Sequence, residues 1–183
     1  MLTSKHPILK EVLDWVIHIG IAVILGVLIV TFVAQITVVN GSSMENTLHD
    51  GDRLIIEKIS PRIGNIKRGD IVTIDDPEKL NEFTRPIIKR VIGVEGDHVQ
   101  ISEGKVFVNG EELIEGYING ETTLEVDERY SDVEVEDGCI YVLGDNRLPY
   151  MSQDSRTLGT ESLKYVTGKA LLRFFPFNSF SLF

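Results

Sequence analysis

Residues 86–110 read PIIKRVIGVEGDHVQISEGKVFVNG, and this stretch indicates a chain built mainly from β-strands. Branched and aromatic residues fill segments 86–94, 98–102 and 105–109, with Gly, Asp and Asn between them, as expected for short strands joined by turns. Apolar and polar residues alternate on both sides of Glu103-Gly104, which predicts a β-hairpin. Runs of the same kind lie at 35–39, 53–58, 70–74, 139–144 and 168–175.

The composition excludes several classes of protein. Eighteen Lys and Arg against 28 Asp and Glu give the 183 residues a formal charge of −10. That balance argues against a nucleic-acid partner, which requires a basic face. The single cysteine, Cys139, excludes an internal disulfide and any zinc site with several cysteines.

The N-terminal part of the chain has a different pattern from the rest. Residues 15–34 read WVIHIGIAVILGVLIVTFVA, and at ~1.5 Å per residue they span the roughly 30 Å hydrocarbon core of a bilayer. A cleavable signal peptide is the alternative, but its apolar region is about 7–15 residues long. Cleavage after Ala34 would also place bulky Phe32 where a small residue is required. We therefore predict an uncleaved transmembrane anchor at residues 14–35.

Flanking charges predict the orientation of this anchor. Lys5 and Lys10 precede it, and no Lys or Arg follows until Arg53. Because basic residues are enriched on the cytoplasmic side, residues 1–13 are expected in the cytoplasm. Residues 36–183 then form an extracytoplasmic domain at the cell (plasma) membrane. Within this domain the polar, acidic block of about residues 103–138 suggests a small inserted subdomain.

Ser43 and Lys89 are candidates for catalysis, each with a simpler alternative. Ser43 lies in NGSSMENTLHDGD, just past the anchor, where many serines only form turns. Lys89 lies among apolar residues in a predicted strand, where a lysine commonly extends its ammonium group to water. If Lys89 is buried instead, the loss of hydration lowers its pKa. A neutral lysine can then accept the proton of a serine nucleophile.

Four segments in a fixed order decide between these interpretations. They are SSMENTL from Ser42, RGDIVTI from Arg68, KRVIGVEGD from Lys89 and GDNRLPYMSQDSR from Gly144. With the anchor before them and GKALLRFFPFN after them, the chain resembles the type I signal peptidases, in the short bacterial form with a single anchor. The resemblance covers nearly the whole chain.

The resemblance implies a signal-peptidase-like β-core and a role for each matching residue. Ser43, which precedes Met44, matches the family's nucleophile, and Lys89 matches its general base. Ser152 matches the serine that orients the lysine amine. The remaining matches are supporting residues, namely Arg90 beside the lysine, Asp145 in GDNR, and the ion pair of Asp154 and Arg156. No metal or organic cofactor is implied.

Two departures from the family pattern bear on these roles. Asn46 stands where the family usually has Pro, and four residues, 148–151, stand where it usually has two. The extra residues either bulge outward or displace Ser152. Gly41 stands where some members have a hydroxyl that assists the oxyanion hole. The Ser43 N–H would then act without that group.

The implied function is a membrane-bound serine endopeptidase that removes signal peptides from secreted preproteins. Its partners are the lipid bilayer and preproteins with small residues at the first and third positions before the cut. One alternative is a catalytically idle relative that binds or chaperones secreted or surface-assembled subunits. A second is a tethered adhesion or structural β-domain, which leaves the four segments unexplained.

Overall fold

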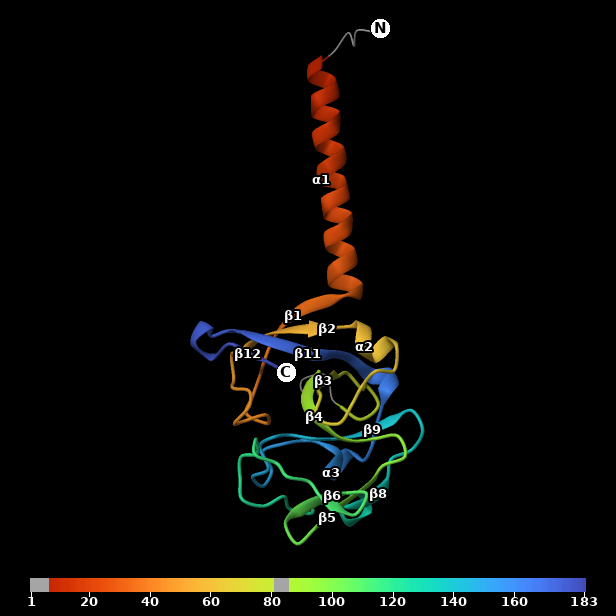
Figure 1. Ribbon diagram of the computed structural model, residues 1–183, viewed down its shortest axis with the longest axis vertical. Coiled ribbons are helices and arrows are strands. Elements are labelled where there is room, and N and C mark those ends of the chain that lie inside the picture. Colours follow the sequence, from red (N-terminus) through yellow and green to blue (C-terminus); the bar gives the residue numbers. More distant parts are fainter. Residues whose placement is uncertain (1–6, 81–85) are drawn as a thin grey trace.

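The computed structural model describes residues 7–80 and 86–183, and it contains one long helix and a mainly-β domain (Figure 1). Helix α1 spans Pro7–Phe32 and projects from the domain. Among the described helices it alone is long and apolar enough to cross a membrane, over Lys10–Phe32. Lys5, on which part of the predicted orientation rests, lies outside the described residues.

The helix ends earlier than the predicted anchor, because the chain turns into a strand. Strand β1 begins at Ala34, so residues 34 and 35 belong to the sheet. Helix α2 (Ile59–Arg62) packs beside the end of α1. Lys58 Nζ donates to the Val30 carbonyl at 3.0 Å, and the Arg62 guanidinium donates to the carbonyls of Phe32 and Thr31. These donors satisfy carbonyls that a helix end leaves unpaired, and they tie the helix to the domain.

The first sheet is curled and carries the core of the domain. Its described strands are ordered β1-β2-β11-β3-β4-β9-β10, with β12 on β11, and neighbouring strands are antiparallel. Their bounds are β1 (Ala34–Val38), β2 (Arg53–Glu57), β3 (Ile71–Ile74), β4 (Ile87–Val94), β9 (Cys139–Leu143), β10 (Glu161–Ser162), β11 (Val166–Phe175) and β12 (Ser181–Leu182).

A smaller second sheet lies between β4 and β9 in the sequence. Its order is β7-β6-β5-β8, formed by β5 (His98–Ser102), β6 (Lys105–Val108), β7 (Glu111–Glu112) and β8 (Asp132–Glu134). The sheet therefore starts at His98, before the expected subdomain start near residue 103. The hairpin is confirmed, since Ser102 pairs with Lys105. Glu103 and Gly104 have φ of 52° and 79°, which suits a tight hairpin turn.

Short helices fill the connections of both sheets. They are α3 (Ser155–Leu158) and three 3₁₀ turns at Glu128–Tyr130, Leu163–Tyr165 and Phe177–Ser179. All eight strand runs expected from the sequence contain strands, so the mainly-β fold with one N-terminal apolar helix is confirmed.

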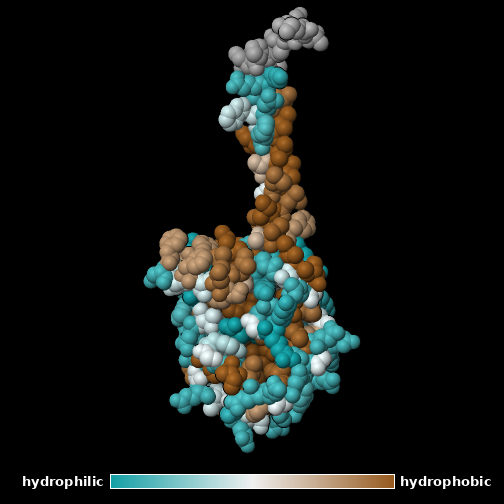
Figure 2. Space-filling view, in the orientation of Figure 1, coloured by the Kyte–Doolittle hydropathy of each residue, from teal (hydrophilic) through white to brown (hydrophobic). Residues whose placement is uncertain are grey.

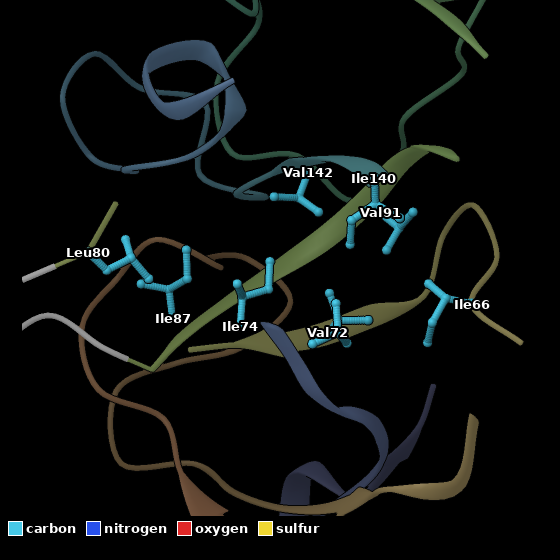
Figure 3. Close-up of a cluster of buried hydrophobic side chains, with 9 residues drawn as sticks. Ile66, Val72, Ile74, Leu80, Ile87, Val91, Ile140 and Val142 are labelled. Carbon is cyan, nitrogen blue, oxygen red and sulfur yellow. The ribbon is translucent and has the colours of Figure 1, made fainter. Parts of the chain in front are cut away.

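Buried apolar side chains form a cluster on each side of the first sheet and a third against the second sheet. One cluster joins β3, β4 and β9 through Val72, Ile74, Val91 and Ile140 (Figure 3). Burying such aliphatic side chains contributes about 1.5–3 kcal/mol each. Strands β3 and β4 are therefore held rigidly, and β4 carries Lys89.

Apolar surface also lies outside the core, beside α1. Figure 2 shows brown surface along α1 and over the adjoining side of the domain near β11 and β12. The side chains of Phe177, Phe180, Leu182 and Ile36 are exposed. A contiguous exposed apolar patch is unfavourable in water. This patch lies next to the helix that could enter a bilayer.

Candidate active site

The loop that follows β1 places Ser43 over the first sheet. Val39 and Met44 on either side of Ser43 are buried in one apolar cluster with Leu48. Met44, expected as a supporting residue, is 1% exposed and packs in this core. These two anchors fix the backbone on both sides of the serine, so its hydroxyl has a defined direction.

Lys89 lies opposite Ser43, on β4. Residues two apart on a strand share a face, so Lys89 lies on the same face as Ile87 and Val91. The lysine is 2% exposed. Its Nζ lies 2.8 Å from Ser43 Oγ and donates to the Ile88 carbonyl at 2.8 Å. The structure thus brings together two residues 46 positions apart in the sequence.

The environment of Lys89 favours the neutral form of its amine more than water does. Burial lowers the pKa of Lys89 to about 8, because desolvation disfavours the charged amine. The negative charges of Asp154 and Asp145 act in the opposite direction, and the positive charge of Arg156 assists the lowering. A pKa near the working pH is what proton transfer requires.

A groove leads to these two side chains. Its volume is about 500 Å³, and its walls come from residues 37–41 on one side and residues 86–88 on the other. Strand β1 is at the edge of its sheet, and β9 pairs with β4 only from Arg90 onward. Residues 37–38 of β1 and 87–88 of β4 therefore lie at strand edges, to which an extended peptide can add by backbone hydrogen bonds.

Arg90 and Asp145 form a buried pair beside the groove. Arg90 donates to both Asp145 oxygens, at 2.8 Å from Nε and 2.6 Å from Nη2. Asp145 is fully buried and also accepts from the Thr47 hydroxyl. This bidentate geometry is the strong form of the Arg–carboxylate interaction. It connects the strand of Lys89 to the loop of Ser43 through Thr47.

Asp154 and Arg156 form a second buried pair. Arg156 Nε and Nη2 each lie 2.9 Å from an Asp154 oxygen, and Asp154 Oδ2 accepts from Gly144 N–H at 3.0 Å. Burial alone would raise the pKa of Asp154, but hydrogen bonds, chiefly from Arg156, leave it below its ordinary value. Asp154 is thus a fixed negative charge that holds the start of the GDNR loop.

Ser152 lies beside Ser43, and it makes no hydrogen bond to Lys89, its expected partner. A Cβ on Gly144 would lie 2.2 Å from Ser152 Oγ and 2.4 Å from the Ser43 carbonyl oxygen, so only glycine fits there. Ser152 Oγ is buried, and none of the described residues offers it a partner of good geometry. Its hydroxyl nevertheless contributes to the lowered pKa of Asp154. No hydrogen bond joins it to Lys89 in this arrangement.

The four-residue connection before Ser152 bulges into solvent. Tyr150 is 98% exposed and has a φ of 62°, a left-handed conformation that is rare for a bulky residue. The next residue, Met151, is also exposed, while Ser152 has returned to the site. The extra length is therefore absorbed outside the core.

The sequence interpretation missed Asn146. Its backbone N–H donates to the Ser43 carbonyl at 3.0 Å, and its Nδ2 donates to the Ser42 carbonyl at 2.9 Å. Asn146 lies in the GDNR segment, so its position in that motif was the available signal. Nothing in the linear pattern shows that it holds the nucleophile's backbone. Within 7–80 and 86–183, no group of three His, Cys, Asp or Glu side chains is placed to hold a metal.

The structure combines an N-terminal apolar helix with a mainly-β domain in which a serine hydroxyl lies beside a buried lysine amine. A family model described as "Signal peptidase, peptidase S26" matches residues 12–175. The chain is 38% identical over 176 residues to Signal peptidase I of Bacillus licheniformis, covering 92% of this chain and 91% of that one. It is 45% identical over 157 residues to Probable signal peptidase I-2 of Synechocystis, covering 85% and 69%.

The protein therefore belongs to the signal peptidase family, peptidase S26, as the sequence segments predicted. Among solved structures, a signal peptidase I from Enterococcus faecalis V583 matches with a TM-score of 0.45 and 27% identity. That match covers 57% of this chain and 95% of the other. The enzyme class, a serine endopeptidase that removes signal peptides, follows from the family.

Proposed function

We propose that Ser43 and Lys89 form the catalytic dyad of a membrane-bound signal peptidase. The observation that carries this proposal is the 2.8 Å separation of Lys89 Nζ and Ser43 Oγ. Burial of the lysine, with its pKa lowered to about 8, supports the same roles. A hydroxyl needs a base within hydrogen-bond reach to become a nucleophile.

The reaction follows from this geometry. Ser43 Oγ attacks the carbonyl carbon of the scissile bond while its proton passes to Lys89 Nζ. The lysine ammonium then gives the proton to the leaving amine, and the acyl group stays on Ser43. Lys89 next takes a proton from water, whose oxygen attacks the acyl carbon. The bond from that carbon to Ser43 Oγ then breaks, the lysine ammonium returns the proton to Ser43 Oγ, and the acyl group leaves as a carboxylic acid. The Ser43 N–H, which makes no hydrogen bond to any part of the chain that the structure describes, is available to the oxyanion.

The groove supports an extended polypeptide as substrate. It is lined by strand edges at residues 37–38 of β1 and 87–88 of β4. A peptide laid between them presents alternate side chains to the floor. Val39, Met44 and Ile88 line the groove together with Ser43, and we expect their bulk to favour small side chains close to the cut. This agrees with the preference implied by the sequence resemblance.

Membrane attachment places the enzyme where signal peptides are. Helix α1 serves as the anchor, and the exposed side chains of Phe177 and Phe180 extend apolar surface next to it. In the orientation expected from Lys5 and Lys10, the catalytic domain is extracytoplasmic at the plasma membrane. The cut then falls on preproteins as they leave the bilayer.

The test is cleavage of a preprotein by the detergent-solubilised chain, with the new N-terminus mapped by mass spectrometry. Ser43→Ala and Lys89→Ala are expected to abolish cleavage, and Lys89→Arg also, because a guanidinium does not deprotonate in this range. Ser42→Ala is the matched control for the nucleophile and retains activity. Cleavage by Ser43→Ala at the normal position would refute the proposed nucleophile.

A further inference from the structure

Arg147 is a fully buried arginine. Its charge is neutralised by Glu115, which lies in the segment between β7 and β8. Its Nη1 lies 2.8 Å from Glu115 Oε2, and its Nη2 bonds the other Glu115 oxygen. Nη1 also donates to Thr123 Oγ1 at 2.6 Å. Side-chain exposures are 0% for Arg147 and 5% for Glu115. Among the described residues, Glu115 supplies the ion-pair partner of this arginine.

Arg147 belongs to the loop that holds the nucleophile. Its Nε donates to the Gly144 carbonyl at 2.8 Å, which closes the loop on itself. Within that loop Asn146 donates to the carbonyls of Ser42 and Ser43. A shift of the Arg147 guanidinium would therefore move Asn146, and with it the serine.

The segment containing Glu115 also contacts the side of the site that carries Lys89. The guanidinium of Arg90, the neighbour of Lys89, lies 4.0 Å from the Tyr117 ring centroid. Tyr117 OH donates to Glu115 Oε1 at 2.8 Å. Burial, with Glu115 acting in the same direction, raises the pKa of Tyr117. The hydroxyl therefore stays protonated and keeps donating to Glu115.

Backbone contacts continue this connection past Tyr117. Asn119 N–H donates to the Asp145 carbonyl at 2.8 Å, and Arg147 N–H donates to the Asn119 carbonyl at 2.8 Å. We name residues 115–123 the brace. Its hydrogen bonds run along the loop of residues 144–147, and its aromatic ring covers Arg90.

We propose that Glu115 and Tyr117 are positioning residues for the peptidase reaction, through which the brace aligns Ser43 with Lys89. This inference rests on the proposed dyad. Neither residue touches the reacting atoms. Glu115 acts through Arg147 and Asn146 on the serine, and Tyr117 acts through Arg90 on the strand of the lysine. Misplacing a catalytic group by ~1 Å can lower the rate about 10²-fold.

The deciding variant is Glu115→Gln, which keeps the shape of the side chain but leaves Arg147 buried without a counter-charge. We expect kcat to fall about 10–100-fold with KM nearly unchanged, because Glu115 does not line the groove and its hydrogen bonds go to Arg147 and Tyr117. The pH midpoint of the rate is expected to stay in place, since Glu115 is not among the charges that shift the pKa of Lys89.

A graded pair of variants tests the aromatic contact. Tyr117→Phe keeps the ring over Arg90 and loses only the hydrogen bond to Glu115, so a small loss of kcat is expected. Tyr117→Leu removes the ring, and a larger loss is expected. The matched control is Glu112→Gln on the second sheet, three residues before Glu115, where Glu112 forms an exposed ion pair with Lys105. It should match the wild type.

Hydrogen–deuterium exchange of the full chain in detergent provides a readout that does not depend on activity. The amide of Asn146 reports its bond to Ser43 directly. It should exchange faster in Glu115→Gln and not in Glu112→Gln, while amides of β3 and β4 stay protected. Protected β3 and β4 amides also show that the variant is folded.

The outcomes separate this inference from the proposed dyad. A folded Glu115→Gln with wild-type kcat and unchanged Asn146 exchange refutes the brace, even if Ser43→Ala is inactive. Active Ser43→Ala instead refutes the dyad. If Glu115→Gln does not fold, the Tyr117 pair decides. Equal kcat for Tyr117→Leu and wild type then overturns the positioning role.

Discussion

The pH dependence of cleavage is the most direct consequence of the Lys89 environment. A pKa of about 8 means that about a tenth of the enzyme holds a neutral lysine at pH 7, and about a hundredth at pH 6. Raising the pH removes the proton that blocks the base, so activity rises with pH. We expect kcat/KM to increase about tenfold per unit below pH 8 and to level off above about pH 9.

The assay is cleavage of one preprotein in detergent micelles between pH 5.5 and 10, with kcat/KM measured at each pH. This parameter reports the ionisation of the free enzyme. The substrate should lack titratable side chains near the cut. A flat profile, or a midpoint near the ordinary lysine value of about 10.4, would refute the reasoning that burial prepares Lys89 as the base.

A substitution moves the same midpoint in a known direction. Asp154 leads the negative charges that raise the pKa of Lys89. Asp154→Asn removes that charge and leaves Arg156 without its counter-ion, and both changes disfavour the lysine ammonium. The midpoint should therefore fall below 8, while Glu112→Gln leaves it in place. A midpoint that rises in Asp154→Asn would contradict the electrostatic assignment.

Three further predictions concern stability, the loop before Ser152 and topology. Burial raises the pKa of Glu161 to about 7, so folding favours the protonated carboxyl. The contribution of Glu161 to stability is therefore fully present below the pKa of the unfolded chain, and it is lost as the pH rises through 7. The stabilising effect of Glu161→Gln on the free energy of unfolding should accordingly be about 3 kcal/mol larger at pH 9 than at pH 4. Urea unfolding followed by near-UV circular dichroism measures this difference. Equal effects at both pH values would refute the prediction. Deleting two residues from 148–151 should keep activity, because that loop bulges outward, whereas Ser152→Ala should lower kcat; a silent Ser152→Ala with a destructive deletion would refute the role of Ser152. Protease outside spheroplasts should digest residues 36–183 and spare the N-terminus, and protection of the domain would reverse the orientation.

Local patterns in the sequence determined the secondary structure. Hairpin β5–β6 follows from alternation around Glu103-Gly104, because adjacent strands joined by a two-residue turn need no distant information. The apolar run of α1 can also be recognised from the sequence, since nearly all of its residues are apolar. Its end differed, because the chain enters strand β1 at Ala34 and pairs there with Glu57 of β2, which is distant in the sequence.

The site was determined in a different way. Ser43 and Lys89 could be named from their resemblance to family segments, but each alone had an ordinary explanation. Only the curled sheet, which brings the loop after β1 onto β4, decides that their side chains meet at 2.8 Å. The lowered pKa of Lys89 likewise depends on burial by residues from several strands, and no linear pattern contains that information.

Only the tertiary structure shows that the segment between β7 and β8 contacts the loop of residues 144–147. Glu115 lies in a polar segment whose sequence pattern predicts exposure to solvent. Its carboxylate is nevertheless buried against Arg147. The burial of a charge depends on which distant partner neutralises it, and 32 residues separate this pair in the sequence. The sequence by itself determined strands, turns and an apolar helix, because those depend on neighbours along the chain. Tertiary structure decided the charges, pKa values and alignment of the site, because those depend on neighbours in space.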